Sequence, residues 1–404
     1  MLGRVFRLSV IVFAAAVCVA CGSARSVHVR VSPKTSLLDQ PLSIRITGAQ
    51  EDTLLTLTAR ENGWTSHATF RVPENGVIDP SRDPSLGGSY SGTQAMGLFW
   101  SMRPTEVGPG APTPWDGGAV QFDVTKGKRH LATTLVTRRS TAPKLRTHDL
   151  DMGKDGLYGR FYSLPPDGTS HTAVVIWGGS EGGLSVEPDA KLLASHGFPT
   201  LALAYFDEPG LPAELGRIPL EYFARAVRWL DRQQGVDPHR LVVYGESRGS
   251  EAALELGVHY PGLVHGVVGI VPASEVEPGN TVYNSGKVPA WTLGGKGIPF
   301  LGSAANIPVQ KIRGPILVSG GGNDLVWPSY YHALDIAERS KADHGPPVTV
   351  VNFSGAGHFG SAAPYLPSAT SHQIGGTTAS NAAARAALWP RILRFLRSVP
   401  EASS

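Results

Sequence analysis

The 404-residue chain contains only two cysteines, Cys18 and Cys21, and both lie close to its N-terminus. If the N-terminal segment is removed at Cys21, the remaining protein has no cysteine pair, which excludes an internal disulfide. The chain also lacks the cysteine and histidine spacing of zinc sites, so no metal is expected. Its stability should therefore come from burial of an apolar core.

Charged residues are also scarce, at 17% of the chain, and the formal net charge is only +3. A charge this small for the length gives no sign of a nucleic-acid partner. Hydrophobic residues make up 41% of the chain, which suits a globular protein with a large core rather than a disordered one. The length favours two domains over one.

The apolar run at residues 8–20 is short for a membrane span, and Arg4 and Arg7 precede it. A basic start followed by a short apolar run and small residues predicts an export signal over residues 1–26. The stretch around Cys21 resembles a bacterial lipobox, although Cys18 stands where leucine is usual. Lipidation of Cys21 would tether the protein to a membrane. The alternatives are a signal without lipidation and an uncleaved anchor. An exported cell-envelope protein is expected, or a cytoplasmic one if the leader does not function.

Residues 27–140 are predicted to form a β-sandwich domain. Apolar and polar residues alternate at 27–31, 42–46, 55–59 and 119–124, and clusters of Gly and Pro separate these short segments. Short alternating strands with turn signals between them are typical of such a domain.

Residues 141–400 follow a different pattern and are predicted to form an α/β domain. Continuous apolar runs, typical of strands buried on both faces, occur at 173–177, 199–205, 241–244, 267–271, 315–319 and 348–351. Helical segments alternate with them at 189–196, 220–232, 250–259, 330–341 and 379–398. This alternation predicts a mainly parallel sheet with helices packed against it.

The motif Gly-x-Ser-x-Gly lies between one of these strands and the following helix, with Ser247 at its centre. In this context the motif predicts a nucleophile elbow, a sharp turn that holds a serine hydroxyl clear of the sheet. The flanking Gly245 and Gly249 leave room for the close approach of strand and helix. With such an elbow on it, the predicted sheet is most simply that of an α/β-hydrolase.

A serine hydroxyl needs a base to accept its proton, and in this fold the acid and the histidine follow the serine in the chain. Asp324 follows the predicted strand at 315–319, and His358 follows the strand at 348–351. Because the loops at the carboxyl ends of parallel strands lie along one edge of the sheet, both side chains should lie beside Ser247. The sequence thus predicts a catalytic triad of Ser247, Asp324 and His358. Alone, Asp324 could be a turn former and His358 a surface residue.

The oxyanion of the tetrahedral intermediate needs two hydrogen-bond donors. The backbone N–H of Arg248, directly after the nucleophile, is one predicted donor. The other should come from the Gly-rich loop at 178–183, from the amide of Ser180 or of Glu181. A phosphate-binding role for this loop is disfavoured, since the lysine and Ser/Thr of a P-loop are absent. No cofactor is expected.

Several stretches together resemble the acyl-CoA thioesterase / bile acid-CoA:amino acid N-acyltransferase family. They include Gly-Gly-Ser-Glu-Gly-Gly at 178–183, Asp-Leu-Val-Trp-Pro-Ser at 324–329 and Gly-Ala-Gly-His at 355–358. The other matching stretches are 39–42, 87–92, 96–101, 203–206, 218–223, 245–249 and 375–377.

The resemblance implies an Ig-like β-sandwich followed by an α/β-hydrolase domain, and hydrolysis of acyl-CoA thioesters through an acyl-enzyme. It places the family's nucleophile on Ser247, its acid on Asp324 and its histidine on His358. Family members that transfer acyl groups to amino acids use cysteine as nucleophile, so Ser247 favours water as acceptor. Many members carry lysine where this chain has Arg248.

Three alternatives stay open. Coenzyme A is a cytosolic metabolite, so an exported enzyme would be a carboxylesterase or lipase-like hydrolase acting on another acyl ester. An acyltransferase to an amine acceptor would use the same acyl-enzyme. A lipoprotein that keeps the fold only to bind a ligand is the third, although the full predicted triad argues against it.

Overall fold

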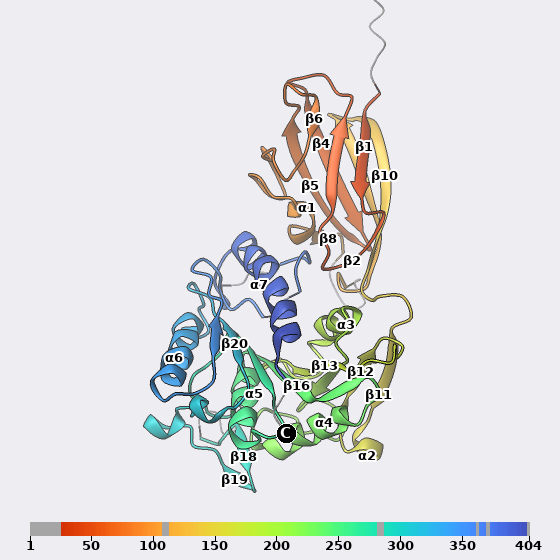
Figure 1. Cartoon of the computed structure of the whole chain (residues 1–404). Helices are drawn as coiled ribbons and strands as arrows, with labels where there is room; N and C mark the ends of the chain where they lie inside the picture. The colour runs from red at the N-terminus through yellow and green to blue at the C-terminus, as the bar shows by residue number, and fades with distance from the viewer. Residues whose placement is uncertain (1–25, 107–112, 281–286, 361–362, 369–371, 402–404) are drawn as a thin grey trace, which may run out of the picture.

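The computed structural model describes residues 26–106, 113–280, 287–360, 363–368 and 372–401. A β part formed by the first third of the chain lies above a larger α/β part (Figure 1). The predicted leader and its Cys21 fall outside the described residues. Within the described ranges, no helix combines the length and the apolar character that crossing a membrane requires.

The β part consists of two sheets that share one apolar core. The smaller sheet pairs β1 (His28–Ser32), β3 (Ser43–Thr47) and β6 (Val77–Ile78), all antiparallel. The larger sheet has the order β2-β10-β9-β4-β5-β7, with β8 also paired to β5. Its strands are β2 (Thr35–Leu37), β4 (Leu54–Glu61), β5 (Trp64–Arg71), β7 (Gly87–Gly88), β8 (Arg103–Pro104), β9 (Gly117–Lys126) and β10 (Arg129–Arg139). Alternate residues of β3 and β4 are buried, as the sequence pattern predicts.

Apolar side chains of both sheets meet between them, among them Ile44, Leu57, Phe70 and Phe122. The short helix α1 (Gly97–Trp100) covers one end of this core with Phe99. The four alternating segments predicted from the sequence are all strands. The other strands of this part, including the long β5 and β10, were not predicted.

The α/β part is built on one eight-stranded sheet with the order β11-β12-β14-β13-β16-β17-β20-β21. From β14 to β21 neighbouring strands are parallel, whereas β11 and β12 add an antiparallel edge. The strands are β11 (Arg146–Leu150), β12 (Tyr158–Ser163), β13 (His171–Trp177), β14 (Thr200–Ala204), β16 (Val236–Glu246), β17 (Gly266–Ile270), β20 (Ile316–Ser319) and β21 (Val348–Val350). Every predicted buried run is a strand of this sheet, which confirms the prediction of a mainly parallel sheet with helices packed against it.

Helices cover both faces of the sheet, and two apolar cores result. On one face lie α4 (Leu220–Asp231), α5 (Arg248–His259) and α6 (Ser329–Ala342), and on the other lie α3 (Glu187–Ser195) and α7 (Thr378–Ser398). The short helix α2 (Met152–Asp155) precedes β12. All five long helices lie where the sequence predicts them, within a few residues at each end.

Two features of the α/β part differ from the sequence-based expectation. The edge strands β11 and β12 were not predicted. The segment between β17 and β20 is an insertion that contains the hairpin β18 (Trp291–Leu293) and β19 (Lys296–Gly297) and the 3-10 turns η1 (Gly302–Ala305) and η2 (Val309–Lys311). Strand β15 (Ile218–Pro219), at the start of α4, pairs with β18 and ties the insertion to the helical face.

Arg138, near the end of β10, makes one polar contact between the β part and the α/β part. Its guanidinium is almost completely buried and donates to the Glu61 carboxylate at 3.0 Å and to the Leu38 carbonyl at 2.6 Å. It also donates to the Tyr365 carbonyl at 2.8 Å, which belongs to the α/β part. The guanidinium carbon lies 4.2 Å from the centre of the Phe99 ring. A buried cation of the β part is therefore satisfied in part by a carbonyl group of the α/β part.

Asp39 makes another contact between the two parts, and its carboxylate contacts residues of α7 and of the end of α3. Its Oδ2 accepts a hydrogen bond from Nε1 of Trp389 in α7 at 2.6 Å and lies 2.5 Å from Nε2 of His196, the residue after α3. Asp39 is itself buried. In Figure 1, α3 and α7 are the helices that face the β part.

We expect Asp39→Ala to loosen this junction, because it leaves the buried Trp389 N–H and the His196 ring without their acceptor. The cost of such unpaired groups is about 1–3 kcal/mol. The expected result is a melting temperature lower by a few degrees and faster proteolysis at residues 140–145. Glu74→Ala, at an exposed position, is the control. A variant that melts and is cleaved like the control would show that the junction does not depend on Asp39.

Candidate active site

Ser247 occupies the turn between the end of β16 and the start of α5. Its backbone has φ 50° and ψ −123°, a strained conformation that non-glycine residues rarely adopt. The Ser247 N–H donates to the Ile270 carbonyl at 2.9 Å, which anchors the turn to β17. A Cβ added at Gly245 would lie 2.1 Å from the Gly249 carbonyl oxygen, so strand and helix cross too closely for a side chain there. The sequence therefore forms the predicted elbow.

His358 and Asp324 lie beside this serine, as the sequence predicts. Nε2 of His358 is 2.8 Å from Oγ of Ser247, and Nδ1 of His358 is 2.8 Å from Oδ2 of Asp324. The Asp324 side chain is completely buried and that of His358 is 10% exposed. The three side chains come from the loops after β16, β20 and β21, which share the carboxyl edge of the sheet.

Further contacts orient the Asp324 carboxylate. Its Oδ2 also accepts the Ser329 hydroxyl at 2.5 Å, and its Oδ1 accepts the backbone N–H of Val326 at 2.9 Å. The ring of Trp327 lies edge-on to the His358 ring, with their centres 5.2 Å apart. Ser329 and Trp327 were not singled out in the sequence, although both fall in the matched stretch 324–329. Each of these groups restricts the rotation of Asp324 or His358.

The predicted oxyanion donors belong to the start of α5 and to the loop at 178–183, and both segments adjoin Ser247. Arg248 is the first residue of α5, so its N–H is among those that have no acceptor within the helix. The loop at 178–183 meets the serine through Gly179, where an added Cβ would lie 2.8 Å from the Ser247 Cβ. The Glu181 carboxylate turns back and accepts the Gly179 N–H at 2.9 Å and the Ser185 hydroxyl. The assignment of the second donor to Ser180 or Glu181 stays a prediction.

The side chain of Arg248 is buried and pairs with Glu251, one turn further along α5. Its Nε donates to Glu251 Oε1 at 2.7 Å, and the Glu251 side chain has no exposed surface. Burial raises the pKa of Glu251 to about 7, against the opposing effects of Arg248 and of the Trp291 indole N–H. The sequence analysis missed Glu251, but the i, i+3 spacing of opposite charges in α5 was a signal for it.

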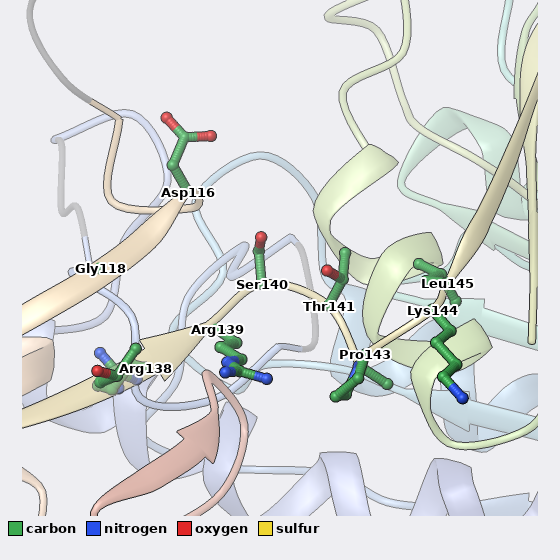
Figure 2. Close-up of a pocket in the computed structure, with 11 residues that line it drawn as sticks. Asp116, Gly118, Arg138, Arg139, Ser140, Thr141, Pro143, Lys144 and Leu145 are labelled. Carbon is green, nitrogen blue, oxygen red and sulfur yellow. The ribbon is translucent and has the colours of Figure 1, made fainter.

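A shallow surface pocket of about 470 Å³ lies along the link between the two parts. Figure 2 shows that the chain from Arg138 to Leu145 forms much of its wall, with Asp116 opposite. None of the proposed catalytic residues lines it, so the pocket belongs to the link between the β part and the α/β part. In the part of the chain that the structure describes, no group of three or more His, Cys, Asp or Glu residues could hold a metal ion.

Two family models match the chain. One, described as the acyl-CoA thioester hydrolase/BAAT N-terminal region, matches residues 39–151. The other, described as BAAT / acyl-CoA thioester hydrolase C terminal, matches residues 218–301 and 299–399. Together they cover most of both parts of the structure.

Three curated mouse (Mus musculus) proteins are similar over nearly the full length. A peroxisomal succinyl-coenzyme A thioesterase is 30% identical, with 89% of this chain and 93% of the relative covered. Acyl-coenzyme A thioesterase 1 is 29% identical, with the same coverage. Acyl-coenzyme A amino acid N-acyltransferase 1 is 27% identical, with 91% of this chain and 96% of the relative covered.

Among solved structures, an esterase of the bacterial hormone-sensitive lipase family aligns at 20% identity. The alignment covers 64% of this chain and 86% of the esterase chain, with a TM-score of 0.42.

The raised pKa of Glu251 predicts a pH-dependent contribution to stability. An unfolded chain releases this proton near the ordinary pKa of 4.5, whereas the folded protein holds it to about 7. Between these values the folded state binds more protons, so the contribution of Glu251 to the free energy of unfolding falls as the pH rises. Glu251→Gln has no proton to release, and its stability relative to the wild type should therefore rise between about pH 5 and pH 8.

Thermal melts of both proteins across this range measure the difference, with the exposed Glu338→Gln as the control. A relative stability of Glu251→Gln that falls with rising pH would mean instead that Arg248 lowers the pKa of Glu251.

Proposed function

Because the chain belongs to the acyl-CoA thioester hydrolase/BAAT family, we propose that it hydrolyses acyl-CoA thioesters through an acyl-enzyme on Ser247. The observation that carries the proposal is the continuous contact from Ser247 through His358 to Asp324, with 2.8 Å at each step. The substrate class comes from the thioesterases among the relatives. A hydrogen-bonded serine, histidine and buried carboxylate in this order is a general device for acyl transfer.

In the first half-reaction, Oγ of Ser247 attacks the thioester carbonyl carbon while Nε2 of His358 takes the serine proton. Asp324 stabilises the imidazolium and holds its Nδ1–H in place. The negative charge on the carbonyl oxygen is received by the N–H of Arg248 and by the 178–183 loop. Collapse of the intermediate breaks the carbon–sulfur bond, and His358 returns the proton to the leaving thiolate. The acyl group is then an ester of Ser247.

In the second half-reaction, water takes the position of the departed thiol and gives its proton to His358. The same two donors stabilise the new oxyanion, the bond to Ser247 Oγ breaks, and the proton passes back to the serine. The products are a free carboxylic acid and the restored enzyme. The net reaction consumes one water and requires no cofactor.

An amine acceptor in place of water is a second candidate, favoured by the similarity to an amino acid N-acyltransferase. Hydrolysis is preferred because the nucleophile here is an oxygen. An acyl oxygen ester reacts with amines more slowly than an acyl thioester does, so an acyl-serine is a poor donor to an amino acid. A substrate other than a CoA thioester is the remaining candidate, and it follows from the predicted leader.

We expect wild-type protein to release thiol from members of an acyl-CoA panel, and Ser247→Ala to lose at least about 10³-fold in kcat. Removal of Oγ deletes the bond-forming atom and leaves only binding and oxyanion stabilisation. Thiol release measures the rate, with an aryl ester as a second substrate and mass spectrometry of the acyl product. Ser303→Ala, at an exposed position in η1, is the control.

Each outcome of this panel decides between the candidates. Near wild-type turnover by Ser247→Ala would overturn the nucleophile. Hydrolysis of the aryl ester alone would move the substrate class to non-CoA esters. An N-acyl product in the presence of amino acids would establish acyl transfer.

For the N-terminal region we propose that residues 1–26 form an export signal with lipidation at Cys21, and that residues 27–140 form a domain of the Ig-like type. Its two sheets around one core support the second assignment. The mass of the mature protein from a bacterial host tests the first. We expect cleavage before Cys21 and added acyl chains, and an intact Met1 on soluble protein would contradict it.

A further inference from the structure

The backbone N–H groups proposed to bind the oxyanion belong to two different segments. Side chains that take no part in the proposed reaction hold each segment in place. One source is Arg248 at the start of α5, and the other is the loop that begins at Gly178. Both must keep their N–H groups directed at the same point within a fraction of an ångström, because such donors act only when they are preorganised. The contacts that could fix them therefore matter for the rate.

The guanidinium of Arg248 uses nearly all of its donors on the protein itself. Besides the bond from Nε to Glu251, it donates to the Pro278 carbonyl at 2.8 Å and to the Glu277 carbonyl at 2.8 Å. The second Glu251 oxygen accepts a further bond from the guanidinium at 3.3 Å. Arg248 itself is only 7% exposed. The residue whose backbone N–H is a proposed donor is thus fixed by its own side chain.

Glu251 connects this side chain to the opposite source of donors. Its Oε2 accepts the indole N–H of Trp291 at 2.9 Å, and Trp291 is completely buried. The Trp291 ring packs against Tyr205 with 5.7 Å between ring centres. The Tyr205 hydroxyl then donates to the carbonyl oxygens of Gly178 at 3.1 Å and Gly179 at 2.6 Å. Burial raises the pKa of Tyr205 well above its ordinary value, so this hydroxyl keeps the proton that it donates.

We propose that Arg248, Glu251, Trp291 and Tyr205 are positioning residues that form one buried scaffold between the two sides of the oxyanion hole. The scaffold runs from Arg248 on α5, across the insertion, to the peptide groups of Gly178 and Gly179. It stabilises the transition state by holding the donors in register and does not contact the substrate. The inference rests on the proposed function only in that Ser247 is the nucleophile, and it holds for a thioester and an oxygen ester alike.

The competing role for Arg248 is recognition of an anionic substrate, since a cation directly after the nucleophile could meet the phosphates of coenzyme A. The structure disfavours that role, because the guanidinium is buried and bonded to Glu251, Glu277 and Pro278. The two roles predict different kinetics. Loss of a phosphate contact raises KM for acyl-CoA alone, whereas loss of positioning lowers kcat on every substrate.

The test uses the full chain with two variants at opposite ends of the scaffold. Tyr205→Phe removes one hydroxyl and keeps the ring, and Arg248→Lys keeps the charge but loses the forked geometry. We expect kcat to fall about 10- to 100-fold in each, with KM within about twofold of wild type, for an aryl ester and for any acyl-CoA that the enzyme accepts. The inhibition constant of an alkyl trifluoromethyl ketone, whose serine adduct mimics the tetrahedral intermediate, should rise by the same factor.

Tyr222→Phe is the matched control. Tyr222 is also a buried tyrosine whose hydroxyl donates to a backbone carbonyl, that of Ala204 at 2.7 Å, but it lies on α4 and not on the scaffold. We expect a comparable fall in melting temperature with unchanged kcat and ketone affinity. In the double variant Tyr205→Phe/Arg248→Lys, the loss should be smaller than the product of the single losses, because both changes act on one scaffold.

Three results would overturn the proposal. The first is an unchanged kcat in folded Tyr205→Phe or folded Arg248→Lys. The second is a loss of kcat in Tyr222→Phe as large as that in Tyr205→Phe. The third is a rise in KM for Arg248→Lys that occurs with acyl-CoA and not with the aryl ester. If one variant fails to fold, the other decides alone. Absence of activity on acyl-CoA leaves the aryl-ester and ketone measurements intact, so failure of the proposed substrate class is distinguishable from failure of the scaffold.

Discussion

The strained backbone of Ser247 is the constraint on which the candidate site depends. A φ of 50° at a serine persists only if the surrounding structure holds it, and here the restraint comes from several directions. The Ser247 N–H is bound by β17, and Gly245 and Gly249 let the strand, the helix and the 178–183 loop approach to van der Waals contact. Because the parallel strands end at one edge, His358 and Asp324 reach the same point from their own loops.

The main elements of the α/β part were predictable because its sheet is buried on both faces. Such strands are continuous apolar runs, and each one predicted from the sequence is present. Strand β11 was missed because it lies at the edge, where it is mostly exposed and carries polar residues such as Arg146 and Asp149. Strand β12, its neighbour, was missed because Arg160 interrupts its apolar pattern. The insertion after β17 was missed for a related reason, since its short strands have no extended pattern.

The proximity of Ser247, Asp324 and His358 could be predicted from their order and their places after strands, because topology alone brings such positions together. The scaffold around them could not. Trp291 reaches Glu251 from an insertion whose path no local pattern describes, and Asp39 reaches Trp389 across 350 positions of sequence. Contacts of this kind depend on the final packing of elements that are distant in the chain, which a pattern of period 2 or 3.6 does not encode.

The β part contacts a segment of the α/β part that lies close in sequence to the proposed base. Its contacts with the α/β part include the segment 363–368, which follows His358 in the chain. The Ser368 N–H donates to the Trp100 carbonyl at 3.1 Å, and the Tyr365 carbonyl accepts from the buried Arg138. From the other side, Asp189 of α3 accepts the Ala363 N–H at 2.9 Å. The segment 363–368, which follows the proposed base in the chain, is thus held between the β part and helix α3 of the α/β part.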